Sequence, residues 1–152
     1  MTTLAFTFSS SGLYYVALTG TKAQPVFHSK AKLTLPANHT VPETVAWFEN
    51  QLELLLNSIR PDQVSYKLTI NNVTNNMVQN CYYGQAMLNL LCHKKVIQLS
   101  HTSPSAIVPS KFGLPKNSDL HNYIDQQIGP HPPHWDSKMK DTALIALIIL
   151  TL

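Results

Sequence analysis

The chain has 152 residues, and 44% of them are hydrophobic, which fits one globular domain and excludes a disordered tail. Only 12% are charged and the formal net charge is +3, with basic residues scattered rather than gathered in the stripe of a dedicated nucleic-acid binder. The apolar run 143–152 is shorter than the roughly 20 residues that cross a bilayer, and the first residues lack signal-peptide features, so we expect a cytoplasmic protein with no membrane partner.

The first part of the chain predicts three strands. Leu4, Phe6 and Phe8 alternate with small or polar residues, which is the period of a strand. The β-rich run 13–18 and the alternating run 26–35 follow after short turns. Successive strands joined by short turns predict an antiparallel meander.

Helices and strands alternate in the remainder. Thr40 and Glu43 form a capping-box pattern, and an apolar period of 3.6 residues predicts a helix over 42–59. The later elements are a strand over 64–70, a helix over 82–92, a short buried strand over 96–99, a short helix capped by Ser118, and a last helix, capped by Asp136 or Ser137, that runs to Leu152. The order β-β-β-α-β-α-β-α-α predicts an α/β fold with a mixed five-stranded sheet flanked by helices, in one domain over 1–152.

Four segments share the order and spacing of motifs in a known family. They are 60–66 at the fourth strand, 83–91 in the following helix, 104–116 after the fifth strand, and 141–147, an Asp followed by an Ala-rich helix. In these segments the chain resembles the RuvC-type resolvases of the RNase H-like superfamily. Bacterial RuvC-like proteins of similar length share a Lys in the fourth strand, at Lys67 here. The resemblance implies an RNase H-like fold and a bacterial source.

The resemblance also implies a catalytic site that this chain does not complete. RNase H-like nucleases hold two divalent cations about 4 Å apart. Carboxylates bind these cations and come from the end of strand one, from strand four and from the last helix. Of the eight acidic residues, none precedes Glu43 and none lies between 63 and 118.

At the three implied positions the chain offers Thr7 or Ser9, Lys67 or Leu68, and Asp141. A lysine repels Mg²⁺ and can neutralise Asp141. We therefore expect Lys67 to lie near Asp141, or near Thr7 and Ser9 of strand one, in a vestigial site without a two-metal mechanism. Asp141 also fits a simpler role, as an acid that favours the N-terminal end of its helix.

A divergent metal-dependent nuclease is the alternative hypothesis. His131 and His134 have a spacing that suits a transition metal, and Asp136 lies close by in the sequence. A metal site takes three or four ligands, and Asp136, His121 or His101 could add one. Such a nuclease would use Asp136, Asp141 and these nearby histidines, with Mg²⁺ as the alternative cofactor. The simpler interpretation is a solvated, proline-stiffened loop.

The preferred hypothesis is a catalytically inactive RuvC-like module without a cofactor, which binds a nucleic acid or a protein. Its candidate binding residues are Lys67, Asn75, Asn76, Lys111 and Lys116. Asparagine side chains can read base edges, although an asparagine-rich loop is also an ordinary polar turn. The low charge makes a protein partner as plausible as a nucleic acid. The two cysteines, 81 and 92, are expected to be core thiols.

Overall fold

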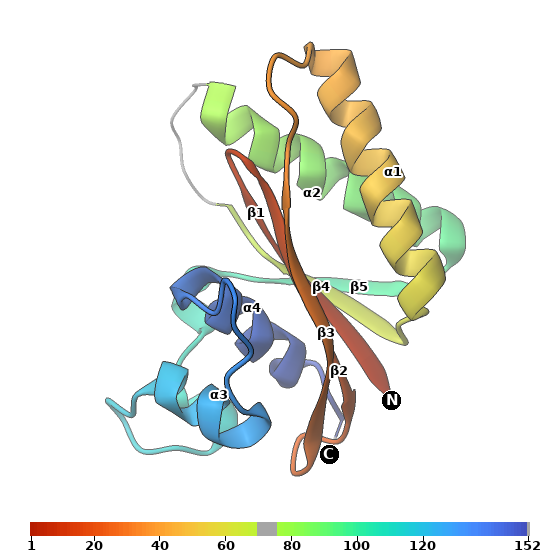
Figure 1. Cartoon of the computed structure of the whole chain (residues 1–152). Helices are drawn as coiled ribbons and strands as arrows, with labels where there is room; N and C mark the ends of the chain where they lie inside the picture. Colours follow the sequence, from red (N-terminus) through yellow and green to blue (C-terminus); the bar gives the residue numbers. More distant parts are fainter. Residues whose placement is uncertain (70–75, 152) are drawn as a thin grey trace.

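The computed structural model describes residues 1–69 and 76–151, apart from the side chains of 76 and 77. Five strands form one sheet in the order β3-β2-β1-β4-β5 (Figure 1). The strands are β1 (Thr2–Ser9), β2 (Gly12–Gly20), β3 (Pro25–Thr34), β4 (Gln63–Lys67) and β5 (Gln98–Thr102).

Strand β1 lies at the centre of the sheet and pairs in two directions. It is antiparallel to β2, and β2 is antiparallel to β3. On its other side β1 is parallel to β4, with Phe6 opposite Tyr66, and β4 is parallel to β5. The predicted meander is confirmed, as is the prediction that the strand after the first helix pairs in parallel with strand one.

Helices cover both faces of this sheet (Figure 1). One face carries α1 (Val41–Ile59) and α2 (Asn76–Lys95), and the opposite face carries α3 (Leu120–Ile128) and α4 (Ser137–Ile148). Two short 3₁₀ helices, η1 (Pro104–Ala106) and η2 (Pro109–Phe112), lie between β5 and α3. The capping box at Thr40 and Glu43 is present at the start of α1, so the sequence signal placed that helix correctly.

The face under α1 and α2 is filled by large apolar side chains. Phe6 and Phe8 on β1 pack with Phe48 and Leu52 on α1. Gly84 of α2 lies against this cluster, because a Cβ placed there would come within 2.4 Å of a Phe8 ring carbon. The close approach of α2 to β1 therefore requires a residue without a side chain.

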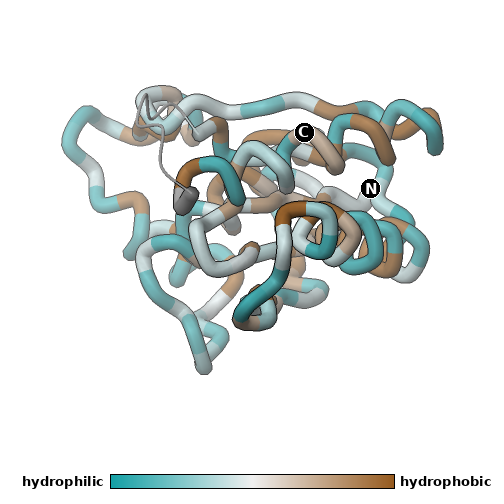
Figure 2. Tube along the Cα trace, turned by 90° about the horizontal axis from the view of Figure 1, so that it is seen from above, coloured by the Kyte–Doolittle hydropathy of each residue, from teal (hydrophilic) through white to brown (hydrophobic). Residues whose placement is uncertain are grey.

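The opposite face is built from small strand residues and a buried helix. Residues 142–147 of α4 are all buried against β1 and β2, which confirms that the last helix packs on the sheet. The Thr3 hydroxyl donates to the carbonyl of Ala146 at 2.9 Å, so the strand holds the helix directly. Hydrophilic and hydrophobic residues alternate along the chain in short stretches (Figure 2). None of the described helices is both long enough and apolar enough to cross a bilayer.

Several predicted boundaries were wrong. The fifth strand begins at Gln98 rather than at 96. It is not buried, because it is an edge strand with mostly exposed residues. Val96 lies before the strand, is 92% exposed and has a left-handed φ of 57°. Strand β4 ends at Lys67, and the predicted end of that strand at residue 70 lies outside the described residues. Asp119 rather than Ser118 caps α3, and α4 ends at Ile148.

Candidate functional site

The candidate site lies where the parallel strands β1 and β4 end. Parallel strands bring their carboxyl ends to one edge of a sheet, and Lys67 is the last residue of β4. Asp141 reaches the same edge from the first half of α4, which crosses above β1 and β4. His121 arrives from the first turn of α3.

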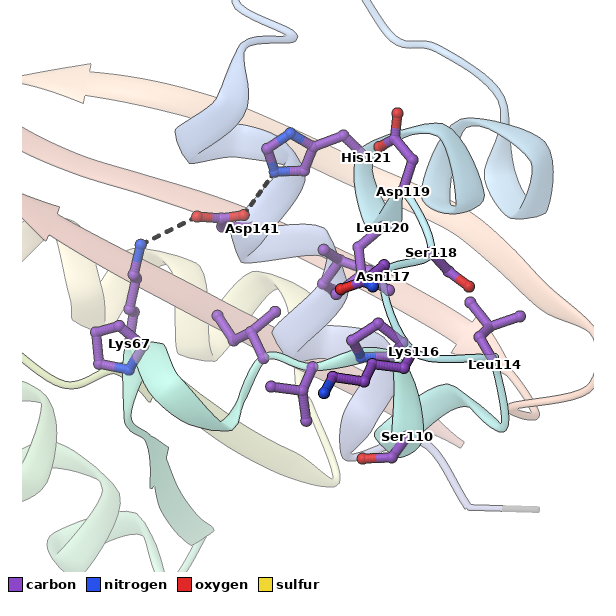
Figure 3. Close-up of a pocket in the computed structure, with 15 residues that line it drawn as sticks. Lys67, Ser110, Leu114, Lys116, Asn117, Ser118, Asp119, Leu120, His121 and Asp141 are labelled. Carbon is purple, nitrogen blue, oxygen red and sulfur yellow. Dashed lines mark hydrogen bonds and ion pairs between the residues drawn. The ribbon is translucent and has the colours of Figure 1, made fainter.

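Asp141 joins these three side chains into one cluster (Figure 3). The Lys67 ammonium Nζ lies 3.0 Å from Asp141 Oδ2. On the other side, His121 Nε2 donates to Asp141 Oδ1 at 2.7 Å. The predicted contact between Lys67 and Asp141 is present, whereas the role of His121 was not recognised in the sequence. Both carboxylate oxygens of Asp141 are thus bound to basic groups, in what we call the Lys67–Asp141–His121 cluster.

The two hydroxyl residues of β1 do not join this cluster. The Thr7 hydroxyl lies 2.7 Å from the Thr142 hydroxyl. Thr142 donates its single proton to the carbonyl of Lys138, so Thr7 must be the donor to Thr142. Ser9 lies by the hairpin turn, with its hydroxyl 3.4 Å from that of Ser11. Thr7 and Ser9 therefore fix the helix and the turn.

The other acids of the chain are used elsewhere. Asp119 and Asp136 cap α3 and α4, and Asp62 accepts a hydrogen bond from the amide of Thr2. Asp125 binds Lys140 at 2.9 Å, while the three glutamates lie on α1. Asp141 is consequently the one carboxylate of the described residues that forms an ion pair with Lys67, while Asp119 lines the adjoining pocket.

The histidines proposed as metal ligands have other partners. His131 stacks on Phe27, with ring centroids 3.6 Å apart, and its Nε2 donates to the carbonyl of Ile128 at 2.7 Å. His134 is exposed, and the Asp136 carboxylate accepts from the amide of Met139. Within residues 1–69 and 76–151, no group of three or more His, Cys, Asp or Glu side chains is placed to hold a metal ion. The loop is therefore packed against β3 instead of being arranged around a cation.

The two other lysines predicted as binding residues are separated in space. Lys116 lines a pocket together with Lys67, whereas Lys111 is exposed on η2 beside the end of α4. Asn75 lies outside the described residues, and the side chain of Asn76 is not described either.

The pocket opens beside the Lys67–Asp141–His121 cluster and has a volume of about 1000 Å³ (Figure 3). One wall is the segment 104–118, and the other comes from the start of α3 and from α4. Aliphatic side chains make up much of the surface, including Ile107, Leu114 and Leu144. Sequence periodicity gave no signal for this pocket, because its walls come from an irregular segment and two separate helices.

The strand order and the helices on both faces define the class of this protein: it has the RNase H-like α/β fold. No protein-family model matches the sequence, and no curated protein matches it.

Solved structures with this fold superpose on nearly the whole chain. RuvC of Thermus thermophilus gives a TM-score of 0.78 at 12% identity, covering 97% of this chain and 92% of that one. The T. thermophilus RuvC in complex with a Holliday junction substrate gives 0.76 at 12% identity, covering 97% and 91%. The yeast mitochondrial Holliday junction resolvase Ydc2 gives 0.74 at 12% identity, covering 96% and 76%. At this identity the similarity establishes the fold.

Proposed function

We propose that this chain is a non-cleaving RNase H-like module that binds a nucleic acid at the edge where β1 and β4 end. The observation that carries the proposal is the state of Asp141, whose two oxygens bind Lys67 at 3.0 Å and His121 at 2.7 Å. A fixed ammonium group thus stands beside the acid to which a nuclease would attach a cation.

Electrostatics argue against a divalent cation at this carboxylate. Two unit charges of like sign about 4 Å apart repel by roughly 4 kcal/mol at an effective dielectric constant of 20, and a divalent ion doubles the charge. Lys67 would have to move away first, and one carboxylate would then hold the ion alone. Two-metal hydrolysis needs several such ligands, so this edge suits binding better than cleavage.

The basic side chains at the sheet edge are compatible with a nucleic-acid partner. The formal net charge is +3, and Lys67, Lys116 and His121 lie around the pocket at the sheet edge. The RuvC structure solved with a Holliday junction substrate has the same fold, which makes branched DNA the first substrate to test. A protein partner is the outcome to consider if no nucleic acid binds.

The absence of cleavage can be tested in the unmodified protein and in a variant that regains a second carboxylate at the site. We expect no cleavage of four-way junctions, duplex DNA or RNA–DNA hybrids in Mg²⁺ or Mn²⁺, and no Mn²⁺ binding by electron paramagnetic resonance. Lys67→Glu adds a second carboxylate beside Asp141 and His121, and this variant should gain an Mn²⁺ site. Metal-dependent cleavage by the unmodified protein that disappears in Asp141→Asn would contradict the proposal.

Binding is tested separately, in EDTA, by fluorescence anisotropy with a labelled four-way junction. Lys67→Met should weaken binding several-fold, because it removes a cation from the site. The matched control is Lys94→Met, which removes an exposed cation from α2 on the opposite face. Equal affinity of both variants, or no binding even at low salt, would reject the nucleic-acid partner.

A further inference from the structure

The pocket beside the Lys67–Asp141–His121 cluster has the size and surface of a small-molecule site. Its volume of about 1000 Å³ is at the upper end of the range typical of ligand pockets, roughly 300–1,000 Å³. Ligand pockets are mostly apolar with a few polar groups that fix orientation. Here the apolar part comes from Ile107, Val108, Leu114, Leu120 and Leu144.

Two lysines and two aspartates line the pocket, and their surroundings differ. Asp141 is neutralised from two sides, by Lys67 and by hydrogen bonding to His121. Asp119 caps α3 by accepting from the amide of Asn122 at 3.1 Å. Lys116 is different, because no acidic side chain in the described part of the chain lies within ion-pair distance of it.

Lys116 lies where it can contact a ligand in the pocket. Its side chain extends among the residues that line the pocket (Figure 3). The first turn of α3 forms part of the same wall, and the Asp119 carboxylate already caps the N-terminus of that helix. An anionic group in the pocket would therefore be held by the Lys116 ammonium group and not by the helix terminus.

The body of the ligand is indicated by what lines the pocket. Among the described residues around it, none is Phe, Tyr or Trp. Nucleobases in single-strand sites usually stack on such rings, whereas branched aliphatic side chains suit an aliphatic chain. We infer that the pocket binds a small ligand with one anionic head, held at Lys116, and an aliphatic body that packs on Ile107, Leu114 and Leu144. The inference does not depend on the nucleic-acid proposal.

Probes with the same tail and different heads test the inference. Octanoate, octyl phosphate, octanol and octylammonium are titrated into the full chain, with dissociation constants from two-dimensional NMR. At least one of the two anionic probes should bind ten-fold or more tightly than octanol, and octylammonium should bind more weakly than octanol. The better anion then distinguishes a carboxylate head from a phosphate head.

Two variants distinguish the contribution of the ligand's anionic head to binding from that of its aliphatic body. Lys116→Met should bring the affinity for the anionic probe to that for octanol, while Lys111→Met, in the same segment but outside the pocket, should change nothing. Leu114→Trp should fill the pocket and weaken every probe. Methyl shifts of Ile107, Leu120 and Leu144 in the unmodified protein give a second measure of where the aliphatic tail binds, and this measure does not require the Leu114→Trp variant to fold.

Three results would overturn the inference. The first is equal affinity for octanol and both anions, or tighter binding of octylammonium. The second is a set of probe-induced shifts confined to residues away from the pocket. The third is a nucleoside monophosphate that binds more tightly than either anionic probe, which would assign the pocket to a nucleotide.

Discussion

The two faces of the sheet are built from alternate residues of the same strands, and they differ in chemistry. Toward α1 and α2, strand β1 presents Leu4, Phe6 and Phe8, which form a core of large apolar side chains. Toward α4 it presents Thr3, Ala5 and Thr7, which are small and in part polar.

The difference in side-chain size explains where the polar cluster is found. Small residues let α4 lie close to β1, and hydroxyl hydrogen bonds from Thr3 and Thr7 fix it there. That position carries Asp141 over the ends of the strands, within 3.0 Å of Lys67. One face thus supplies mainly burial, while the other supplies both burial and an exact placement of charges.

The prediction with the largest expected effect tests whether burial on the α4 face is required for folding. Leu147 is fully buried, and burying a leucine contributes about 1.5–3 kcal/mol before the cost of an interior charge is added. Leu147→Asp should leave no soluble folded protein, as judged by expression and circular dichroism. Leu54→Asp, at a position on α1 that is 64% exposed, is the control that should fold. Cooperative unfolding of Leu147→Asp would show that the α4 face is dispensable.

The next effect concerns the tight approach on the α1–α2 face. A methyl group at Gly84 would meet the Phe8 ring at 2.4 Å, so Gly84→Ala should destabilise by about 1–3 kcal/mol in urea unfolding. Alanine is the better helix former by about 1 kcal/mol, and Ala86→Gly at an exposed position of α2 measures that term alone. A stabilised Gly84→Ala variant would mean that the contact relaxes freely.

Alkaline pH should lower the free energy of unfolding through a buried thiol on the α1–α2 face. Burial raises the pKa of the Cys92 thiol from 9.0 to about 11. The unfolded chain loses this proton first, so the free energy of unfolding should fall between pH 9 and 11, by about 1 kcal/mol at pH 10. Urea unfolding at pH 8, 9 and 10 measures the decline, and it should be shallower in Cys92→Ala. Identical slopes would show that Cys92 does not ionise differently on folding.

The Lys67–Asp141 contact should contribute a modest energy. The two side chains are 24% and 23% exposed, so solvent screens part of their attraction. A double-mutant cycle with Lys67→Met and Asp141→Asn should give a coupling energy of about 1 kcal/mol, reduced in 1 M NaCl. Additive single effects would mean that the contact positions these groups without stabilising the fold.

The smallest expected effect is a loss of folding stability at acid pH, and it comes from a carboxylate on the α3–α4 face. Burial alone would raise the pKa of Asp125, but hydrogen bonds from Trp135 and Lys140 lower it below its usual value. The ionised carboxylate stabilises the folded state above pH 3.8, and this contribution is lost as the pH falls below that value. Acid unfolding followed by near-ultraviolet circular dichroism should show a shallower pH dependence for Asp125→Asn. An unchanged curve would contradict this role.

The sequence predicted those features that follow from local pattern or from strand adjacency. Apolar periods gave the order of elements, and the adjacency of strands one and four led to the contact between Lys67 and Asp141. His121 was placed with the wrong partners, because its contact depends on how α3 lies against α4. The fate of Thr7 was also missed, since Thr142 is brought to it only by close helix packing.

The central position of β1 has a consequence for biosynthesis. Strands β1 to β3 can pair as soon as residue 34 has left the ribosome, but the side chains of Ala5, Val16 and Leu18 are covered only when α4 follows. At about 5–20 residues per second, that delay is on the order of ten seconds. During this time a nascent chain displays an apolar sheet face, and until β4 has emerged it also displays the unpaired edge of β1. Chaperones bind such features, and neighbouring chains aggregate on them.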